Sequence, residues 1–395
     1  MNVQSPEKYE LNQEDKQNLQ EIVNNVLNGN KDWFESHGIL IGEKGNYWVL
    51  NYIQSFIPNR YNLLTRGLIV DKTNGKIVSM PFKRFGNYGE DFRGYKTVVD
   101  FSKSEVLEKL DGSMLAVAFP DNDHENPLYH TKRMVSGFSF KAQKGFDGEE
   151  VNLMKIAGEY VKQINFSAND TDKTWVFELI HNERPVITKY EKSQVGLYLI
   201  GARNLNTFDE YSEEQLDKMA SVIGVKRPRR WGVMGSHEAV KQMMAQFPED
   251  FEGFVVRQVD DGQRAKVKSL DYLKRHSLIG GSSFKNIIPL WVSGETSEIL
   301  TYFPESKVKF EILENAFQKK LSETLVVVHA LLKNKYSNKK DLSLAMKTQN
   351  ISVFESSMAF NCFEKPQEQF SHLIEQQMKK LAVYKIIGLL GLPED

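Results

Sequence analysis

The 395-residue sequence contains a single cysteine, Cys362, and this scarcity limits the structures that can form. One cysteine cannot build a disulfide framework within the chain, nor a zinc site with four cysteine ligands. The sequence also lacks a run of about 18 apolar residues, which a helix needs to cross a membrane. We therefore expect a protein of a reducing compartment, the cytoplasm, that has no membrane partner.

An excess of charge of one sign is also missing. The formal net charge is −1, although charged residues make up 26% of the chain. Such a protein is not a globally basic nucleic-acid binder, so any nucleic-acid contact needs locally clustered lysines and arginines. The first residues, MNVQSPEKYELNQEDK, are polar and acidic, which is unlike a signal peptide.

The length of the chain predicts two domains. An apolar stripe at helical spacing predicts a helix over residues 11–27. From residue 39 to about 269, short apolar segments alternate with turns and with three helical stretches, which is typical of an α+β domain. The clearest hairpin is RGLIVDKTNGKIVSM, because Asn74 and Gly75 both tolerate positive φ.

The pattern changes after about residue 278. A Gly-Gly-Ser-Ser cluster at residues 280–283 is typical of a domain joint. Beyond it, apolar residues recur three and four positions apart, as in helices. These positions are Phe310, Leu313, Phe317, Leu321 and Leu325, then Phe370, Leu373, Ile374, Met378, Leu381 and Tyr384. We predict one domain over residues 1–280, with the helix at its start, and an all-α domain over residues 281–395.

Four short motifs place charged residues beside predicted strands. The first is KLDG, residues 109–112. A lysine amine attacks phosphorus only when it is neutral, and both desolvation and neighbouring cations favour that form. Asp111 could orient such a site, and Gly112 would let the backbone approach a ligand closely. Taken alone, the motif also suits a solvated hairpin turn.

The second and third motifs each contain a carboxylate. In WVFELIHNERPVI, Glu178 interrupts an apolar strand, and a buried carboxylate is costly unless it is paired or binds something. It could hold a ribose hydroxyl or a metal, or face solvent. In FEGFVVRQ, Glu252 and Gly253 open a strand. One carboxylate there suits hydrated magnesium, although a simple turn residue would look the same.

The fourth motif is RAKVKSLDY, where strand alternation puts Lys266 and Lys268 on one face. The two ammonium groups could hold a phosphate, or they could keep an exposed edge strand soluble. Upstream, Arg66 precedes a glycine, and the box FKRFGN offers Lys83 for a phosphate and Phe85 for a base or the core.

Two further basic segments lie outside these motifs. Lys132 belongs to the tripeptide TKR, which follows a predicted strand. The run KRPRRW, residues 226–231, could contact an RNA backbone or form a solvated loop.

The order of the motifs resembles that of the covalent nucleotidyltransferases, which include polynucleotide ligases and mRNA capping enzymes. KLDG looks like their motif I, FELIHNE like motif III, EGFVV like motif IV and AKVKS like motif V. The residues within the motifs are most similar to those of the bacteriophage RNA ligase 1 family, and the resemblance covers about residues 60–275. One departure is Leu110, where we would expect a polar or acidic residue.

The resemblance implies an ATP-grasp-like nucleotidyltransferase domain on antiparallel sheets, followed by the all-α domain. It also implies an ATP-dependent RNA ligase, which joins 5′-phosphate and 3′-hydroxyl ends through a lysyl–AMP intermediate and an adenylated RNA end. Lys109 would be the nucleophile, and Lys266 and Lys268 would hold the reacting phosphates. The implied ATP-binding residues are Arg66, Lys83, Lys109, Leu110, Asp111, Gly112, Glu178, Glu252, Gly253, Lys266 and Lys268.

The resemblance further implies Mg²⁺, with Mn²⁺ as a substitute, held by Glu252 and through water by Asp111. Phe85, Lys132 and Tyr272 are the implied RNA contacts. The natural RNA, which could be a tRNA in a repair reaction, stays open, and no obligate protein partner is expected. If a phage encodes the protein, its compartment is the host cytoplasm.

Three alternatives share these motifs. A capping guanylyltransferase would use GTP, and a standard DNA ligase would join DNA. Both should carry a β-rich second domain, against which the helical pattern argues. A non-catalytic RNA-binding or assembly protein could retain the fold.

Overall fold

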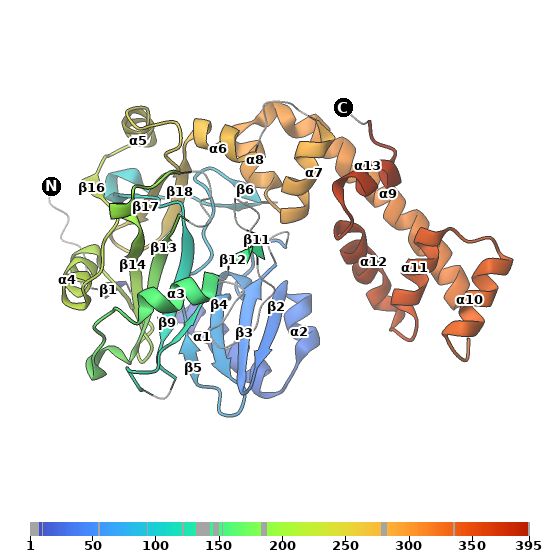
Figure 1. Ribbon diagram of the computed structural model, residues 1–395, viewed down its shortest axis with the longest axis horizontal. Coiled ribbons are helices and arrows are strands. Elements are labelled where there is room, and N and C mark those ends of the chain that lie inside the picture. Colours follow the sequence, from blue (N-terminus) through green and yellow to red (C-terminus); the bar gives the residue numbers. More distant parts are fainter. Residues whose placement is uncertain are drawn as a thin grey trace. The chain divides into compact units, whose positions relative to one another are not determined.

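The computed structural model describes residues 8–9, 11–53, 56–92, 94–120, 122–131, 143–144, 150–151, 153–182, 188–277, 283–334 and 336–393. Its internal contacts separate two compact units, Met1–His276 and Ser277–Asp395. Figure 1 shows sheets and helices in the first unit and helices in the second.

Antiparallel sheets form the body of the first unit (Figure 1). A six-stranded sheet has the order β1 (Lys8–Tyr9), β15 (Glu210–Tyr211), β14 (Gly196–Asn204), β13 (Lys173–Ile180), β9 (Ser113–Ala118) and β10 (Leu128–His130). One four-stranded sheet has the order β16 (Arg230–Val233), β8 (Ser104–Glu108), β17 (Gly253–Gln258) and β18 (Arg264–Lys268). Another has the order β2 (Ile39–Lys44), β3 (Tyr47–Tyr52), β4 (Arg66–Asp71) and β5 (Ile77–Ser79). Two-stranded pairs are β6 (Asp91–Phe92) with β7 (Tyr95–Lys96), and β11 (Gln143–Lys144) with β12 (Glu150–Val151).

Helices cover these sheets or follow them in the chain. The first unit contains α1 (Gln13–Leu27), α2 (Lys31–Ser36), α3 (Leu153–Val161), α4 (Glu213–Ile223), α5 (His237–Met244) and all but the last residue of α6 (Leu270–Ser277). The second unit contains α7 (Phe284–Ser293), α8 (Thr296–Tyr302), α9 (Lys307–Leu332), α10 (Lys339–Thr348), α11 (Val353–Cys362), α12 (Phe370–Lys379) and α13 (Val383–Leu390).

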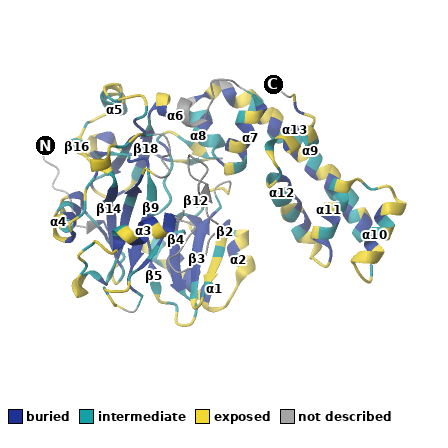
Figure 2. Cartoon of the chain, in the orientation of Figure 1, coloured by how far each residue is buried: buried dark blue, intermediate teal, exposed yellow. Residues whose placement is uncertain are grey.

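Strand alternation gives the two sheets that matter most a dry face and a polar face. On β13, Trp175, Phe177 and Leu179 pack into a core with α3 and α4. On the other sheet, Phe254 and Val267 belong to a separate buried core. Figure 2 shows these strands as largely buried. The remaining faces carry Glu178 of β13 and the lysines Lys266 and Lys268 of β18, because successive side chains in a strand point to opposite sides.

The β2–β5 sheet and α1 share a third core. The predicted hairpin joins β4 to β5, and Gly75 has φ +76°, the left-handed conformation that the turn requires. A side chain at this glycine would meet Val23 of α1 at 2.9 Å, so the turn also packs tightly against the helix. The expected N-terminal helix is confirmed as α1, which Asn12 caps by accepting a hydrogen bond from the Asp15 backbone N–H.

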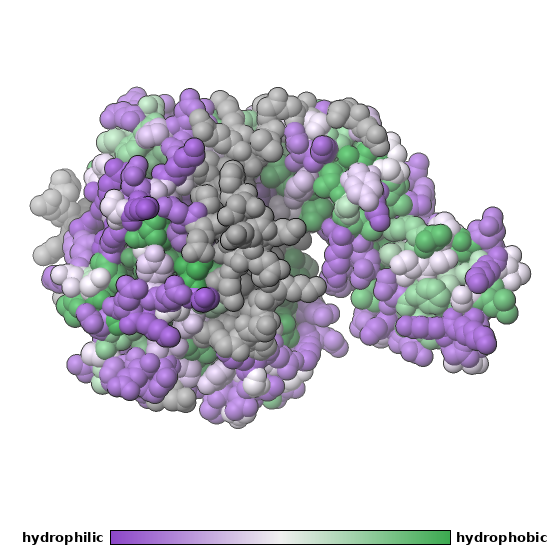
Figure 3. Space-filling model, viewed as in Figure 1, coloured by the Kyte–Doolittle hydropathy of each residue, from purple (hydrophilic) through white to green (hydrophobic). Residues whose placement is uncertain are grey.

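The second unit is helical, as its apolar spacing predicts. Phe310, Leu313 and Phe317 lie on the buried stripe of α9. Tyr384 departs from the pattern, because α12 ends at Lys379 and α13 starts a new helix, on which Tyr384 is 68% exposed. Figure 3 shows hydrophilic side chains over much of this unit, with smaller hydrophobic patches between them.

The α+β class with a helical C-terminal region is therefore confirmed. The Gly-Gly-Ser-Ser segment lies mostly outside the described residues. Within the described ranges, no helix combines the length and the apolarity needed to cross a bilayer.

Candidate active site

A cavity of about 270 Å³ lies between the polar faces of the two sheets. Met114 of β9, Glu178 of β13 and Ile200 of β14 line one wall. Leu107 and Glu108 of β8, Val255 and Arg257 of β17, and Arg264 and Lys266 of β18 line the other. Further lining residues are Arg66, Phe82, Phe85, Lys109, Leu110, Gly112, Glu213 and Pro228.

The strand register orders the second wall into rows. Gly253 is opposite Lys268, and Val255 is opposite Lys266. Arg257 is opposite Arg264, one row further along. The alternation predicted for AKVKS is confirmed, since Ala265 and Val267 are buried, whereas Lys266 and Lys268 are half-buried.

Lys109 lies in the short loop between β8 and β9. Its backbone N–H donates to the Gly253 carbonyl at 2.9 Å, which joins the first motif to the third. Gly112 packs against β13 so closely that a Cβ there would lie 2.5 Å from the Leu179 carbonyl oxygen. The loop therefore needs glycine at this point, and the position of the lysine is fixed from both neighbouring sheets.

The Lys109 side chain is paired with Glu252. The Lys109 Nζ lies 2.6 Å from Glu252 Oε1, and Lys268 Nζ lies 3.9 Å from the same oxygen. Glu252 is 5% exposed, and its other oxygen, Oε2, is buried without a hydrogen-bond partner in the described part of the chain. A buried carboxylate oxygen without a donor is costly, which favours a ligand at this point.

Glu178 faces the cavity and is half-buried. Burial raises its pKa to about 7, with Lys109 and Arg66 acting against that shift and Glu252 adding to it. The carboxyl group therefore changes charge near neutral pH. Such perturbed groups concentrate at functional sites.

Two cations flank Phe85 at the edge of the cavity. The Arg66 guanidinium lies 5.3 Å from the ring centroid, and Lys266 Nζ lies 5.4 Å from it. The Arg66 Nε is buried and has no hydrogen-bond partner among the described residues. The Phe85 ring, in the box after β5, thus brings together Arg66 of β4 and Lys266 of β18.

Asp111 and Tyr272 lie behind the loop. Tyr272 is 2% exposed, and its hydroxyl donates to Asp111 Oδ1 at 2.9 Å. The other carboxylate oxygen accepts the Thr188 backbone N–H at 2.8 Å. These bonds engage both carboxylate oxygens of Asp111, and they tie the buried Tyr272 hydroxyl to the loop that carries Lys109.

One expected contact lies elsewhere. Lys83 pairs with Asp15 of α1, with Nζ 2.6 Å from Oδ2, and lines a neighbouring cavity of about 300 Å³ rather than the one beside Lys109. Lys132 lies outside the described residues.

Buried ion pairs close the far end of the cavity. Glu210 pairs with Arg203 at 2.5 Å and with Arg264 at 2.6 Å, and Glu213 pairs with Arg257. The surrounding arginines lower the pKa of Glu210 to about 2, although burial opposes them. This network joins the six-stranded sheet to β17 and β18, so it fixes the spacing of the two walls.

The basic run at residues 226–231 is neither free nor simply solvated. Arg229 pairs with Glu108 at 2.8 Å, and Arg230 with Glu105 at 3.4 Å. Arg227 pairs with Glu213 and Asp217. Acidic neighbours therefore offset much of the charge that the sequence offers for RNA.

Several site residues were not predicted. Arg264 shares the alternation that revealed the lysines of β18, so the pattern could have indicated it. Tyr190 carries no such signal, yet its hydroxyl accepts the Asp111 backbone N–H at 2.8 Å.

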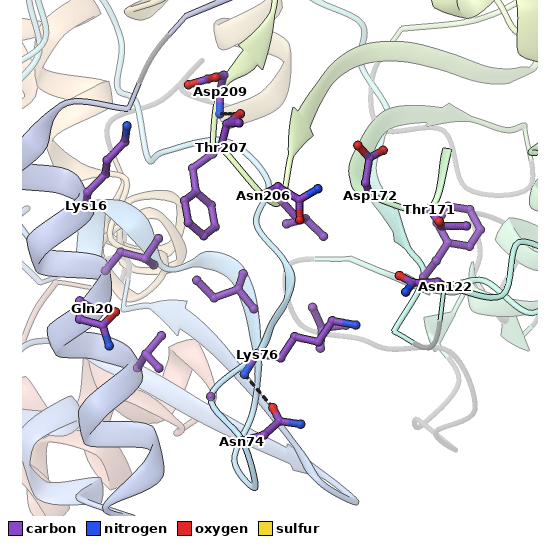
Figure 4. Close-up of a pocket in the computed structure, with 18 of the residues that line it drawn as sticks. Lys16, Gln20, Asn74, Lys76, Asn122, Thr171, Asp172, Asn206, Thr207 and Asp209 are labelled. Carbon is purple, nitrogen blue, oxygen red and sulfur yellow. Dashed lines mark hydrogen bonds between the residues drawn. The ribbon is translucent and has the colours of Figure 1, made fainter. Parts of the chain in front are cut away.

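A larger cavity, about 1190 Å³, lies between α1, the β4–β5 turn and residues 205–209. In Figure 4, Lys16 and Gln20 lie on one side of it, and Asn206, Thr207 and Asp209 come from the opposite segment. None of the residues expected in the site lines this cavity.

Within the described ranges, no three histidine, cysteine or acidic side chains form a group that could hold a metal ion. A metal at Glu252 would therefore depend on ligands from water and substrate, as hydrated magnesium commonly does.

Comparisons with known proteins find similarity to RNA ligases. The chain is 26% identical over 281 residues to a protein of the Autographa californica nuclear polyhedrosis virus provisionally named bifunctional polynucleotide kinase/RNA ligase, covering 66% of this chain and 38% of the other. It is 27% identical over 215 residues to a provisionally named RNA ligase of Thermovibrio ammonificans, covering 53% and 52%. The chain thus spans about half the length of these relatives or less.

Among solved structures, an archaeal ATP-dependent RNA ligase is similar over 70% of each chain, with 14% identity and a TM-score of 0.48. The family model described as RNA ligase, of the T4 RNA ligase 1 type, matches residues 64–275, which is just over half of the chain. The chain belongs to the bacteriophage RNA ligase 1 family.

Proposed function

We propose that the protein is an ATP-dependent RNA ligase that forms a lysyl–AMP intermediate on Lys109. The observation that carries this proposal is the position of Lys109 at a cavity whose walls hold Glu178 and Lys266. A lysine, a carboxylate and a second cation beside one cavity suit a nucleotide whose α-phosphate is attacked by the lysine amine.

The cavity offers separate surfaces for the parts of ATP. Leu107, Leu110 and Val255 provide apolar contact for a base, which gives the unexpected leucine of the first motif a role. Glu178 would bind a ribose hydroxyl. Arg66 and Lys266 would hold phosphate oxygens, and the Arg66 Nε–H lacks a hydrogen-bond partner among the residues that the structure describes.

In the first step, the neutral Lys109 amine attacks the α-phosphorus of ATP. A phosphorus–nitrogen bond forms, the bond to the bridging oxygen of pyrophosphate breaks, and the amine loses a proton. Lys266 and Lys268 would neutralise charge on the α-phosphate and the leaving pyrophosphate. The Lys109 Nζ is engaged by Glu252, so this contact must loosen before the amine can attack.

Glu252 fits a divalent cation, because its Oε2 is buried and unpartnered in the described chain. Bound there, Mg²⁺ or Mn²⁺ would offset the charge that develops on the phosphates. A single protein carboxylate is sufficient for hydrated magnesium.

The AMP then passes to an RNA 5′-phosphate, which regenerates the lysine and leaves an adenylated end. Attack by a 3′-hydroxyl forms the phosphodiester and releases AMP. The covalent lysyl–AMP intermediate divides one difficult step into easier ones.

Mass spectrometry of the intact protein after incubation with ATP and Mg²⁺ tests the proposal. We expect the addition of one AMP to the wild-type protein and to Lys103→Ala, whose lysine is exposed before β8. Lys109→Ala should stay unmodified. A wild-type protein that gains no AMP would contradict the proposal.

Changing the nucleotide and changing the polynucleotide strand distinguish the RNA ligase from the alternative enzymes. Labelling with GTP in place of ATP would indicate a guanylyltransferase. Sealing of 5′-phosphorylated single strands, RNA against DNA and free against splinted, identifies the polynucleotide. Labelling without sealing of any strand would exclude the ligase assignment.

A further inference from the structure

Two hydrogen bonds bracket the Lys109 backbone, and they differ in kind. On one side, the Lys109 N–H donates to the Gly253 carbonyl at 2.9 Å. On the other, the Asp111 N–H donates to the Tyr190 hydroxyl at 2.8 Å. The first bond belongs to main chain alone, whereas the second depends on one side chain that lies 79 residues away in sequence.

The segment that carries this tyrosine is tied to both loops of the site. The Thr188 backbone N–H donates to Asp111 Oδ2 at 2.8 Å, and its hydroxyl donates to the Asp250 carbonyl at 2.6 Å. The Lys189 N–H donates to Asp250 Oδ2 at 3.1 Å. Asp250 lies two residues before Glu252, so residues 188–190 bridge the loop of the candidate nucleophile and the loop of the candidate metal ligand.

The chemistry of the phenol suits this task. Burial and the nearby carboxylates, including Asp111 and Glu252, hold the pKa of Tyr190 above its usual range, so the hydroxyl stays neutral. A neutral phenol accepts one hydrogen bond and still donates another. Asp111 is 7% exposed, so solvent would compensate poorly for a lost acceptor at its N–H.

We infer that Tyr190 is a positioning residue, which aligns the Lys109 amine for attack by holding the Asp111 peptide group. This inference rests on the proposed function. Attack on phosphorus needs a close and aligned nucleophile, and a displacement of about 1 Å can cost about 100-fold in rate. The later sealing of an adenylated RNA end does not use the lysine amine, so it should not need this alignment.

Tyr190→Phe removes only the hydroxyl, and two assays measure its effect on adenylation and on sealing separately. The first measures single-turnover formation of lysyl–AMP across ATP concentrations. The second measures sealing of RNA that already carries a 5′-adenylate. We expect the maximal adenylation rate to fall by about 10- to 100-fold, with the half-saturating ATP concentration and the sealing rate unchanged.

Tyr198→Phe is the matched control, because its hydroxyl donates to the Gln194 carbonyl at an exposed position. It should leave both steps at wild-type rates. Thr188→Ala is a second variant, which removes one of the two hydrogen bonds from the same segment to Asp250 and leaves Tyr190 intact. We expect it to slow adenylation selectively and by less than Tyr190→Phe does.

Four outcomes would overturn the inference. Adenylation at the wild-type rate in Tyr190→Phe would show that the bond is dispensable. Equal losses in both steps, or a raised ATP requirement alone, would indicate general damage or a binding role. If Tyr190→Phe does not fold, unchanged adenylation in Thr188→Ala would decide against it. A wild-type protein that forms no lysyl–AMP would instead refute the proposed function.

Discussion

Lys109 and Glu252 form an ion pair in the candidate site, with 2.6 Å between Nζ and Oε1. Each is assigned a separate task in the proposed reaction. The two charges therefore neutralise each other, so a nucleotide and a cation that separate them must offer each a new partner. Removing one member leaves the other with a desolvated charge, which is costly.

Glu252→Gln tests this relationship. The amide keeps the shape of the side chain but loses the charge that would attract a divalent cation. We expect lysyl–AMP formation to fall by at least about 100-fold, and Mn²⁺ binding, followed by electron paramagnetic resonance, to be lost. Glu238→Gln, at an exposed position of α5, should change neither. Retained Mn²⁺ binding in Glu252→Gln would place the metal elsewhere.

The raised pKa of Glu178 predicts a pH dependence of stability. Its folded-state pKa is about 7, whereas an ordinary glutamate titrates near 4.5. Between pH 4.5 and 7 the Glu178 carboxyl group therefore holds a proton in the folded protein but not in the unfolded chain. The stability that this protonated group contributes is lost as pH rises through 7. Comparison of Glu178→Gln with the wild type by urea unfolding should show the difference changing by up to about 3 kcal/mol between pH 4.5 and 8. If the unfolding free energies of the two proteins changed with pH in parallel, the raised pKa of Glu178 would be contradicted.

Gly112→Ala should disturb the loop through steric contact alone. The added Cβ would lie 2.5 Å from the Leu179 carbonyl oxygen, and backbone on a central strand cannot move aside cheaply. We expect a loss of about 1–3 kcal/mol in unfolding free energy, with slower adenylation. Gly42→Ala is the control, because its Cβ would meet Val49 at an ordinary 3.7 Å. Equal stability of the two variants would mean that the loop adapts.

Glu210→Gln tests the ion-pair network beneath the cavity. The substitution leaves Arg203 and Arg264 without their buried counter-charge, so we expect a loss of about 3–5 kcal/mol by urea unfolding. Asp217→Asn removes an acidic partner whose side chain is 43% exposed, and it should cost less than about 1 kcal/mol. A small effect at Glu210 would mean that the network contributes little to the spacing of the sheets.

The local patterns of the sequence predict much of the fold because they depend on neighbouring residues. The alternation around Val267 identifies a strand with one dry face, whatever lies across the sheet. The Asn-Gly pair before Lys76 identifies a turn, because few other residues tolerate its backbone conformation. Tyr384 shows the limit of such patterns, since its spacing continues a stripe across a point where the chain begins a new helix.

The site is less predictable because its contacts join distant segments. Lys83 meets Asp15 across 68 positions, and no short window of sequence contains both. Tyr190 follows a strand without any periodic pattern, so its bond to Asp111 depends on how residues 188–190 return to the loop. The ordered motifs identify which residues gather, whereas the partners of each oxygen and nitrogen require the structure.

The residue-by-residue pairing of β17 with β18 limits where related sequences can gain or lose residues. Deleting one residue within β18 would turn Val267 toward the cavity and carry a lysine into the buried core, because side chains alternate strictly. The connection at residues 259–263 lies outside the paired rows, so it can change in length without that inversion. We expect natural insertions and deletions to cluster there, while the spacing from Arg264 to Lys268 stays constant.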